Sequence, residues 1–123
     1  MRNGSSLLYA AAAMLVLAGT AQAATNINWL SGLPAGGTFD WFDTANWTGG
    51  NIPDSEGESA IFPSSTNSAT IDLKGNVLDL VGTGANPGLI HLQAQSWAET
   101  VNLIDSVGGA SIKCLNFEVQ QWG

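Results

Sequence analysis

The chain has 123 residues, with ten acidic residues against three basic ones and a formal net charge of −7. A surface this acidic repels phosphate backbones and anionic lipids, which excludes nucleic acid and membrane surfaces as partners. Cys114 is the only cysteine, so an internal disulfide is excluded as well. We expect a buried, inert thiol at Cys114, with an intermolecular disulfide or a reactive thiol as the alternative.

The first 23 residues are predicted to be a secretory signal peptide. Arg2 supplies a positive amino-terminal region, residues 7–17 are uninterruptedly apolar, and residues 21–23 (Ala-Gln-Ala) offer a cleavage site with small residues. The apolar run is shorter than the roughly 20 residues that span a bilayer. We therefore expect export through the general secretory pathway, and a secreted or cell-surface location for residues 24–123, which are long enough for one small domain.

Short alternating runs follow, separated by Gly, Pro, Asn and Ser, a pattern typical of an all-β domain. The runs recur about every 8 to 13 residues, a spacing that sandwiches, barrels and solenoids share. The last run, residues 112–119, changes parity between Cys114 and Leu115, which predicts a β-bulge. Strands are predicted at residues 26–30, 38–42, 60–62, 69–73, 77–80, 90–94, 101–103 and 112–119.

The same alternation predicts which side chains point inward. In residues 69–73, the side chains of Ala69, Ile71 and Leu73 are expected to point inward and that of Asp72 outward. The next strands supply further inward sets in the same way. These are Leu78 and Leu80, then Ile90, Leu92 and Ala94, then Val101 and Leu103.

A group of large aromatic residues falls within 34 positions of the chain: Trp29, Trp41, Phe42, Trp47 and Phe62. Rings of this size bury much apolar area, so we interpret the group as a core, or as a plug over an open sheet end. The alternative is a platform on which Trp41, Trp47 and Trp29 stack against sugar rings. That alternative predicts a carbohydrate-binding module with an extracellular polysaccharide as partner.

Asp54, Glu56 and Glu58 alternate in a glycine-containing stretch. If the stretch is extended, the three carboxylates point the same way and could ligate calcium, although a solvated loop is favoured. We expect no other cofactor. His91 is the only histidine and is expected to be exposed on a strand. No catalytic motif is present, so we predict no catalytic residue and no enzymatic activity.

A family resemblance rests on a spaced set of aromatic, turn and strand residues. The set comprises Trp41, Asn46, Trp47, Gly49, Gly50, Pro53, Ala60 and Phe62, followed by Ile71, Leu73 and Gly75. The stretch resembles the opening of large bacterial exported proteins that carry autotransporter-associated β-strand repeats or end in PEP-CTERM-type sorting signals. Glu58 stands where that pattern has an Asp before the Ala-x-Phe strand.

The resemblance implies a parallel β-helix, a solenoid whose first coil is capped by the aromatic segment; a small β-sandwich is the alternative. It divides the exported chain into a capping segment at residues 24–68 and a solenoid-like region at residues 69–123, expected to be truncated. The implied function is a non-enzymatic structural or adhesin-like surface element, the N-terminal part of an autotransporter-like passenger. Its implied partners are extracellular polysaccharide or cell-surface components.

Overall fold

The computed structural model describes residues 25–94 and 100–121, so the predicted signal peptide lies outside the described residues. Strands dominate, and two short 3-10 helices are the helical elements of this part of the chain. The elements are β1 (Thr25–Asn28), β2 (Gly37–Asp40), η3 (Thr44–Asn46), η4 (Thr48–Gly50), β3 (Glu58–Phe62), β4 (Ala69–Asp72), β5 (Val77–Asp79), β6 (Ile90–Ala94), β7 (Val101–Ile104), β8 (Ser111–Lys113) and β9 (Phe117–Gln121). The all-β prediction is confirmed.

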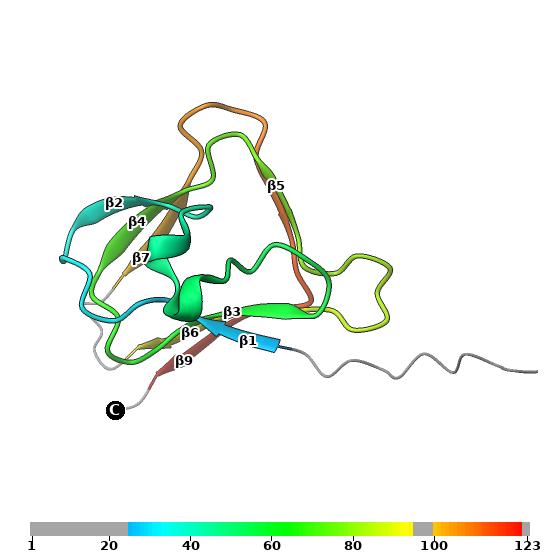
Figure 1. Ribbon diagram of the computed structural model, residues 1–123, viewed down its shortest axis with the longest axis horizontal. Coiled ribbons are helices and arrows are strands. Elements are labelled where there is room, and N and C mark those ends of the chain that lie inside the picture. Colours follow the sequence, from blue (N-terminus) through cyan, green and yellow to red (C-terminus); the bar gives the residue numbers. More distant parts are fainter. Residues whose placement is uncertain (1–24, 95–99, 122–123) are drawn as a thin grey trace, which may run out of the picture.

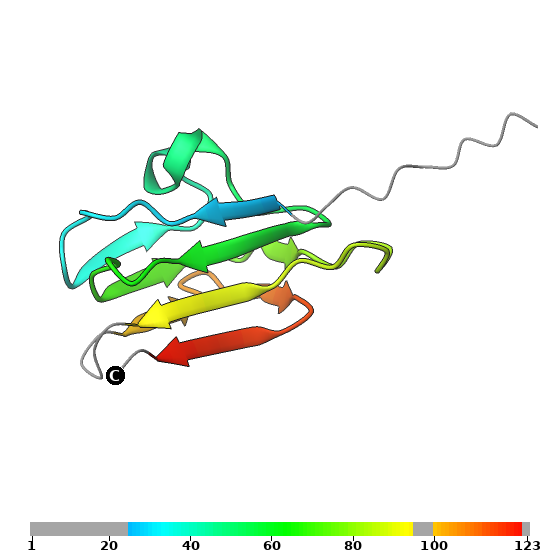
Figure 2. The ribbon, with the colours of Figure 1, turned by 90° about the horizontal axis from the view of Figure 1, so that it is seen from below.

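The strands form three parallel sheets, ordered β1-β3-β6-β9, β2-β4-β7 and β5-β8. Seen from one end, the sheets lie along the three sides of a triangle (Figure 1). Seen from the side, the four strands of the largest sheet lie one below another, from β1 to β9 (Figure 2). Every ladder between these strands is parallel, whereas a β-sandwich of the kind considered above pairs its strands antiparallel.

Strands in each sheet pair so that apolar residues stack on apolar residues. Ile71 lies between Phe39 and Leu103, and Leu78 pairs with Ile112. Because a one-residue slip would turn these side chains to the opposite face, burial of one face specifies the register. Ile71 and Leu78 are fully buried, and the predicted inward residues Ala69, Leu73, Leu80 and Ile90 are buried with them.

Two predictions about individual strands are wrong. Asp72 was expected to face solvent but is only 6% exposed, because its carboxylate accepts backbone N–H groups from Lys74 and Ser106. Residues 112–119 are not one bulged strand but parts of β8 and β9, which belong to different sheets. The change of parity at Cys114 therefore marks a corner of the triangle, where the chain leaves one sheet and enters the next.

A segment we call the lid, residues 41–57, contains η3 and η4 and lies beyond β1 at one end of the stack (Figure 2). Gly49 and Gly50 have φ angles of 78° and 71°, the left-handed conformation expected of a tight reversal. β9 lies at the opposite end of the stack. Within the described residues, no helix is long and apolar enough to cross a bilayer.

Candidate functional site

The aromatic cluster is buried. Trp29, Trp41, Trp47 and Phe62 expose between 0% and 2% of their surface, as the core interpretation predicts. Trp47 makes edge-on contacts with Trp29, at a centroid distance of 4.9 Å, and with Trp41, at 5.0 Å. Such geometry places the positive ring edge against the negative ring face. Phe42 is half-buried and packs against the hydrophobic core.

Hydrogen bonds hold the indoles in place. The Trp47 Nε1–H donates to the Trp41 carbonyl at 2.7 Å, and the Trp41 Nε1–H donates to the Pro53 carbonyl at 3.0 Å. Both bonds are buried, where an unpaired donor would be costly. The indoles of Trp29, Trp41 and Trp47 thus form an internal cluster. They do not present the flat outer platform that the carbohydrate-binding interpretation requires.

The carboxylates of Asp54, Glu56 and Glu58 do not converge on one site. The prediction of a shared calcium site assumed an extended stretch, but the chain turns here and Gly57 has a φ of 84°. Glu58 Oε2 accepts the backbone N–H groups of Asp54 and Ser55, at 2.9 and 3.0 Å, whereas Glu56 reaches a different loop. Within residues 25–94 and 100–121, no group of three His, Cys, Asp or Glu side chains could hold a metal ion.

Glu56 fastens the lid to the loop between β5 and β6. Its Oε2 accepts the backbone N–H of Thr83 at 2.9 Å and the Thr83 hydroxyl at 2.8 Å. Its Oε1 accepts the N–H groups of Ala85 and Asn86, at 3.2 and 3.1 Å. These donors, above all the Thr83 N–H, hold the pKa of the Glu56 carboxyl below its ordinary value. One carboxylate therefore joins segments about thirty residues apart.

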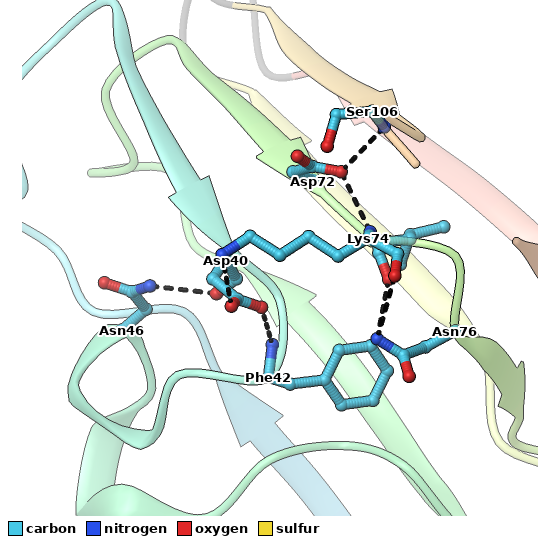
Figure 3. A network of polar contacts seen from close by, with 8 residues as sticks. Asp40, Phe42, Asn46, Asp72, Lys74, Asn76 and Ser106 are labelled. Carbon is cyan, nitrogen blue, oxygen red and sulfur yellow. Dashed lines mark hydrogen bonds and ion pairs between the residues drawn. The ribbon is translucent and has the colours of Figure 1, made fainter. Parts of the chain in front are cut away.

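A second polar network lies at the corner that follows β2 and β4 (Figure 3). Asp40 and Asp72 are register partners on these strands. Lys74 Nζ lies 2.9 Å from Asp40 Oδ2, and Asp72 Oδ1 accepts the Lys74 N–H at 2.9 Å and the Ser106 N–H at 3.1 Å. Lys74 thus contacts two successive strands of one sheet.

The charged side chains at this corner stabilise each other's charged forms. The hydrogen bond from Lys74 lowers the pKa of Asp40, and Asp40 in turn raises the pKa of Lys74. The Ser106 hydroxyl, followed by the Lys74 N–H, lowers the pKa of Asp72. Both carboxylates are therefore held in the charged form that the turn donors require.

Asp105 closes the turn between β7 and β8. Its Oδ1 accepts the N–H groups of Gly75, Val107 and Gly108, at 2.8, 3.1 and 2.9 Å. Its Oδ2 accepts the Ala110 N–H at 2.7 Å. These donors, Ala110 first, lower the pKa of the Asp105 carboxyl. Because Gly75 belongs to the preceding turn, Asp105 also ties two stacked corners together.

These turn carboxylates were not predicted from the sequence. Asp79 shows the signal that could have found them, because it accepts the N–H groups of Val81 and Gly82, two and three residues further on. An Asp that bonds its own backbone in this way, followed closely by glycine, is a common turn signature. The contact between Glu56 and Thr83 has no such local signal.

His91 and Cys114 lie apart from these networks. His91 is half-buried rather than exposed, and on β6 it pairs with Ile61 and Glu118 of the neighbouring strands. Cys114 is half-buried at a corner, where removal from solvent raises the pKa of its thiol. A raised thiol pKa keeps the sulfur protonated and unreactive near neutral pH.

The end of the stack opposite the lid is apolar and uncovered. Phe117 and Val119 on β9 are 52% and 63% exposed, although Ile90, the register partner of Phe117, is 1% exposed. Leu115, at the corner before β9, is 53% exposed. The alternation places Phe117 and Val119 on the inner face, but only the assembled stack shows that nothing in the described chain lies over them.

Comparison with known proteins finds no relative: no protein-family model, no curated protein and no solved structure matches this chain.

Proposed function

We propose that the chain forms a short parallel β-helix and serves as an exported, non-enzymatic structural or adhesive element of the cell surface, the N-terminal part of a passenger-type protein. The observation that carries the proposal is the register of the three sheets. Ala60 pairs with Ile90 and Ile90 with Phe117, each roughly thirty residues further along the chain. Solenoid repeats have periods of about 20 to 50 residues.

The lid supports this proposal because a parallel β-helix needs protection at its ends. The first coil would otherwise expose a row of unpaired backbone groups, which invites aggregation. The buried indoles of Trp41 and Trp47 lie in the segment that covers that end. The same two residues belong to the motif that resembles the opening of exported passenger proteins.

The turn carboxylates also favour a structural role. Asp72 and Asp105 are occupied by backbone N–H donors from two successive turns each, and Glu56 is occupied by the loop that follows β5. Carboxylates bonded in this way stabilise a stack of coils. Extracellular polysaccharide or cell-surface components are then expected to contact the outer faces of the sheets rather than the buried indoles.

Export is the part of the proposal that can be tested most directly. The chain is expressed with residues 1–23 intact in a bacterial host, and the mass and amino terminus of the exported product are determined. We expect a product that begins at Ala24. Leu15→Arg, which interrupts the apolar run, should retain the precursor in the cytoplasm, and Leu15→Ile should not. A wild-type chain retained at full length would rule out the exported function.

The fold is tested separately on the exported product. Amide hydrogen exchange should protect the amides of β3, β4 and β6, which lie between neighbours in the stack, more strongly than those of residues 31–35, which lie in the loop between β1 and β2. A chain with uniform, weak protection would not be a β-helix. Added polysaccharides should leave the fluorescence of the three buried indoles unchanged, whereas a blue shift or quenching on binding would revive the sugar-stacking alternative.

A further inference from the structure

We propose that residues 46–48 accept an N-linked glycan only while the chain is unfolded, and that a glycan at Asn46 and a closed lid exclude each other. These residues, Asn-Trp-Thr, match the acceptor pattern Asn-X-Ser/Thr. In residues 24–123 the pattern occurs here alone. The inference goes beyond the proposed function and rests on it in one respect, because this modification is made on exported chains.

The modification requires free access to one atom, the side-chain nitrogen of Asn46. Nδ2 attacks the anomeric carbon of the first sugar of an oligosaccharide that is linked to a lipid pyrophosphate. The carbon–nitrogen bond forms while the bond from that carbon to the pyrophosphate oxygen breaks. The lipid pyrophosphate leaves with the electron pair, one Nδ2 proton passes to a base of the transferase, and nothing is oxidised or reduced.

The fold turns this nitrogen inward. Asn46 is the last residue of η3 and is 6% exposed. Its Nδ2 donates to the carbonyl of Asp40, the last residue of β2, at 2.9 Å (Figure 3). The opposite orientation of the amide would set its oxygen against the carbonyl oxygen, so the hydrogen bond decides which atom faces β2. A sugar on Nδ2 would have to occupy the space that β2 fills.

The backbone of the acceptor sequence is also held. The Asn46 N–H donates to the Asp43 carbonyl at 3.1 Å, and the Asn46 carbonyl accepts the Leu30 N–H at 2.9 Å. Trp47, the middle residue, is 2% exposed and forms an antiparallel bridge with Trp29. Of the three acceptor residues, Thr48 alone is exposed. A transferase that must hold all three residues can therefore reach only the last of them in the folded chain.

A glycan already present at Asn46 would in turn oppose closure of the lid. The glycan is bulky and hydrophilic and stays in solvent. The next residue, Trp47, has to enter the core, where its Nε1–H donates to the Trp41 carbonyl at 2.7 Å. Adjacent residues cannot be placed independently, so a sugar kept outside would hold the Trp47 ring away from its position 4.9 Å from Trp29.

The first experiment compares the folded chain with one whose lid is open. The mature chain, residues 24–123, is incubated with an oligosaccharyltransferase and its lipid-linked donor, and transfer is followed by mass. We expect no transfer to the wild-type chain and transfer at one site to Trp41→Ala, which loses an indole that packs against Trp47. Adding Thr48→Ala to Trp41→Ala should abolish the transfer, because residue 48 completes the acceptor pattern.

The second experiment measures the effect of the glycan on folding. The chain is secreted from a host that glycosylates proteins during translocation, behind a signal peptide of that host. We expect the form modified at Asn46 to lose the cooperative thermal transition of the unmodified form and to emit tryptophan fluorescence at longer wavelength.

The matched control moves the glycan to an exposed strand residue. Thr48→Ala combined with Ile104→Thr transfers the acceptor pattern to Asn102, which is exposed on β7. Residue 104 is itself 38% exposed, so its replacement leaves the core unchanged. A glycan at Asn102 should leave the thermal transition in place.

Three outcomes would refute the inference. The first is transfer to the folded wild-type chain as fast as to Trp41→Ala. The second is no transfer to either chain, in the purified reaction or in the host. The third is a form modified at Asn46 that unfolds at the midpoint of the unmodified form. A wild-type chain secreted without glycan, while Trp41→Ala is modified in the same host, supports the inference, because lid closure then precedes transfer.

The proposed function fails on a different result. A precursor retained in the bacterial host would refute the exported function. It would leave the comparison of wild type with Trp41→Ala unaffected, because that comparison uses the purified chain.

Discussion

Replacement of Trp47 by phenylalanine tests whether the lid is part of the core. The substitution removes the buried hydrogen bond to the Trp41 carbonyl, about 1 kcal/mol of net stability. The smaller ring also leaves about two methylene equivalents of apolar burial unfilled, at roughly 0.8 kcal/mol each, together with the cavity that remains. We expect a total loss of about 2–4 kcal/mol, a large part of the roughly 5–15 kcal/mol that stabilises a small domain.

The measurement is urea unfolding followed by far-ultraviolet circular dichroism, at one fixed chain concentration because association would add to apparent stability. Thermal unfolding should show a midpoint lowered by roughly 10–30 °C. Val77→Ala, at an exposed position, is the control and should change stability by less than about 0.5 kcal/mol. An effect of Trp47→Phe as small as that of the control would refute the packing of the lid into the core.

Three further predictions concern the turns and the close approach of neighbouring segments. Gly88→Ala should destabilise the chain by about 3 kcal/mol or more, because a Cβ there would collide with the Glu58 backbone; an unchanged thermal midpoint would contradict this. Glu56→Gln should lower the urea concentration at the unfolding midpoint, whereas Glu118→Gln, on the exposed edge strand, should not. Equal effects would show that the hydrogen bonds from the β5–β6 loop to Glu56 do not stabilise the fold. The pKa values of Glu56 and Asp105 are lowered in the folded chain, so the unfolded chain binds more protons in acid. The free energy of unfolding should therefore fall as the pH drops below about 4, towards those lowered values. A thermal unfolding midpoint that stays constant from about pH 7 to about pH 2 would contradict this prediction.

The strands and the core residues could be predicted from local pattern to a useful extent. The alternation of Ala69, Ile71 and Leu73 with polar neighbours predicted their burial, and the density of rings around Trp41 and Trp47 predicted an internal cluster. Both predictions succeed because side-chain alternation and the tendency of large rings to be buried depend on composition over a few residues.

The site residues were predicted less well, because their contacts are distant in sequence. Asp54, Glu56 and Glu58 alternate, but with the turn at Gly57 the Glu58 carboxylate accepts the Asp54 N–H while the Glu56 carboxylate points to a different loop. Glu56 then finds its partners about thirty residues away, on the loop after β5. The lid and the loop meet only after the strands have stacked, so no local pattern could indicate the contact.

The amino-acid sequence alone determined the β class, the turn positions and much of the inner face, since these follow from the two-residue pleat and from the backbone freedom of glycine. Parallel pairing was expected from the family resemblance, whereas folding in three dimensions decided which strands are neighbours and that β9 lies at an edge of its sheet. The physical reason is the long separation in sequence between the residues that pair. Pairs such as Ile90 with Phe117 join segments separated by many bonds, and their free energy depends on the whole stack rather than on either segment.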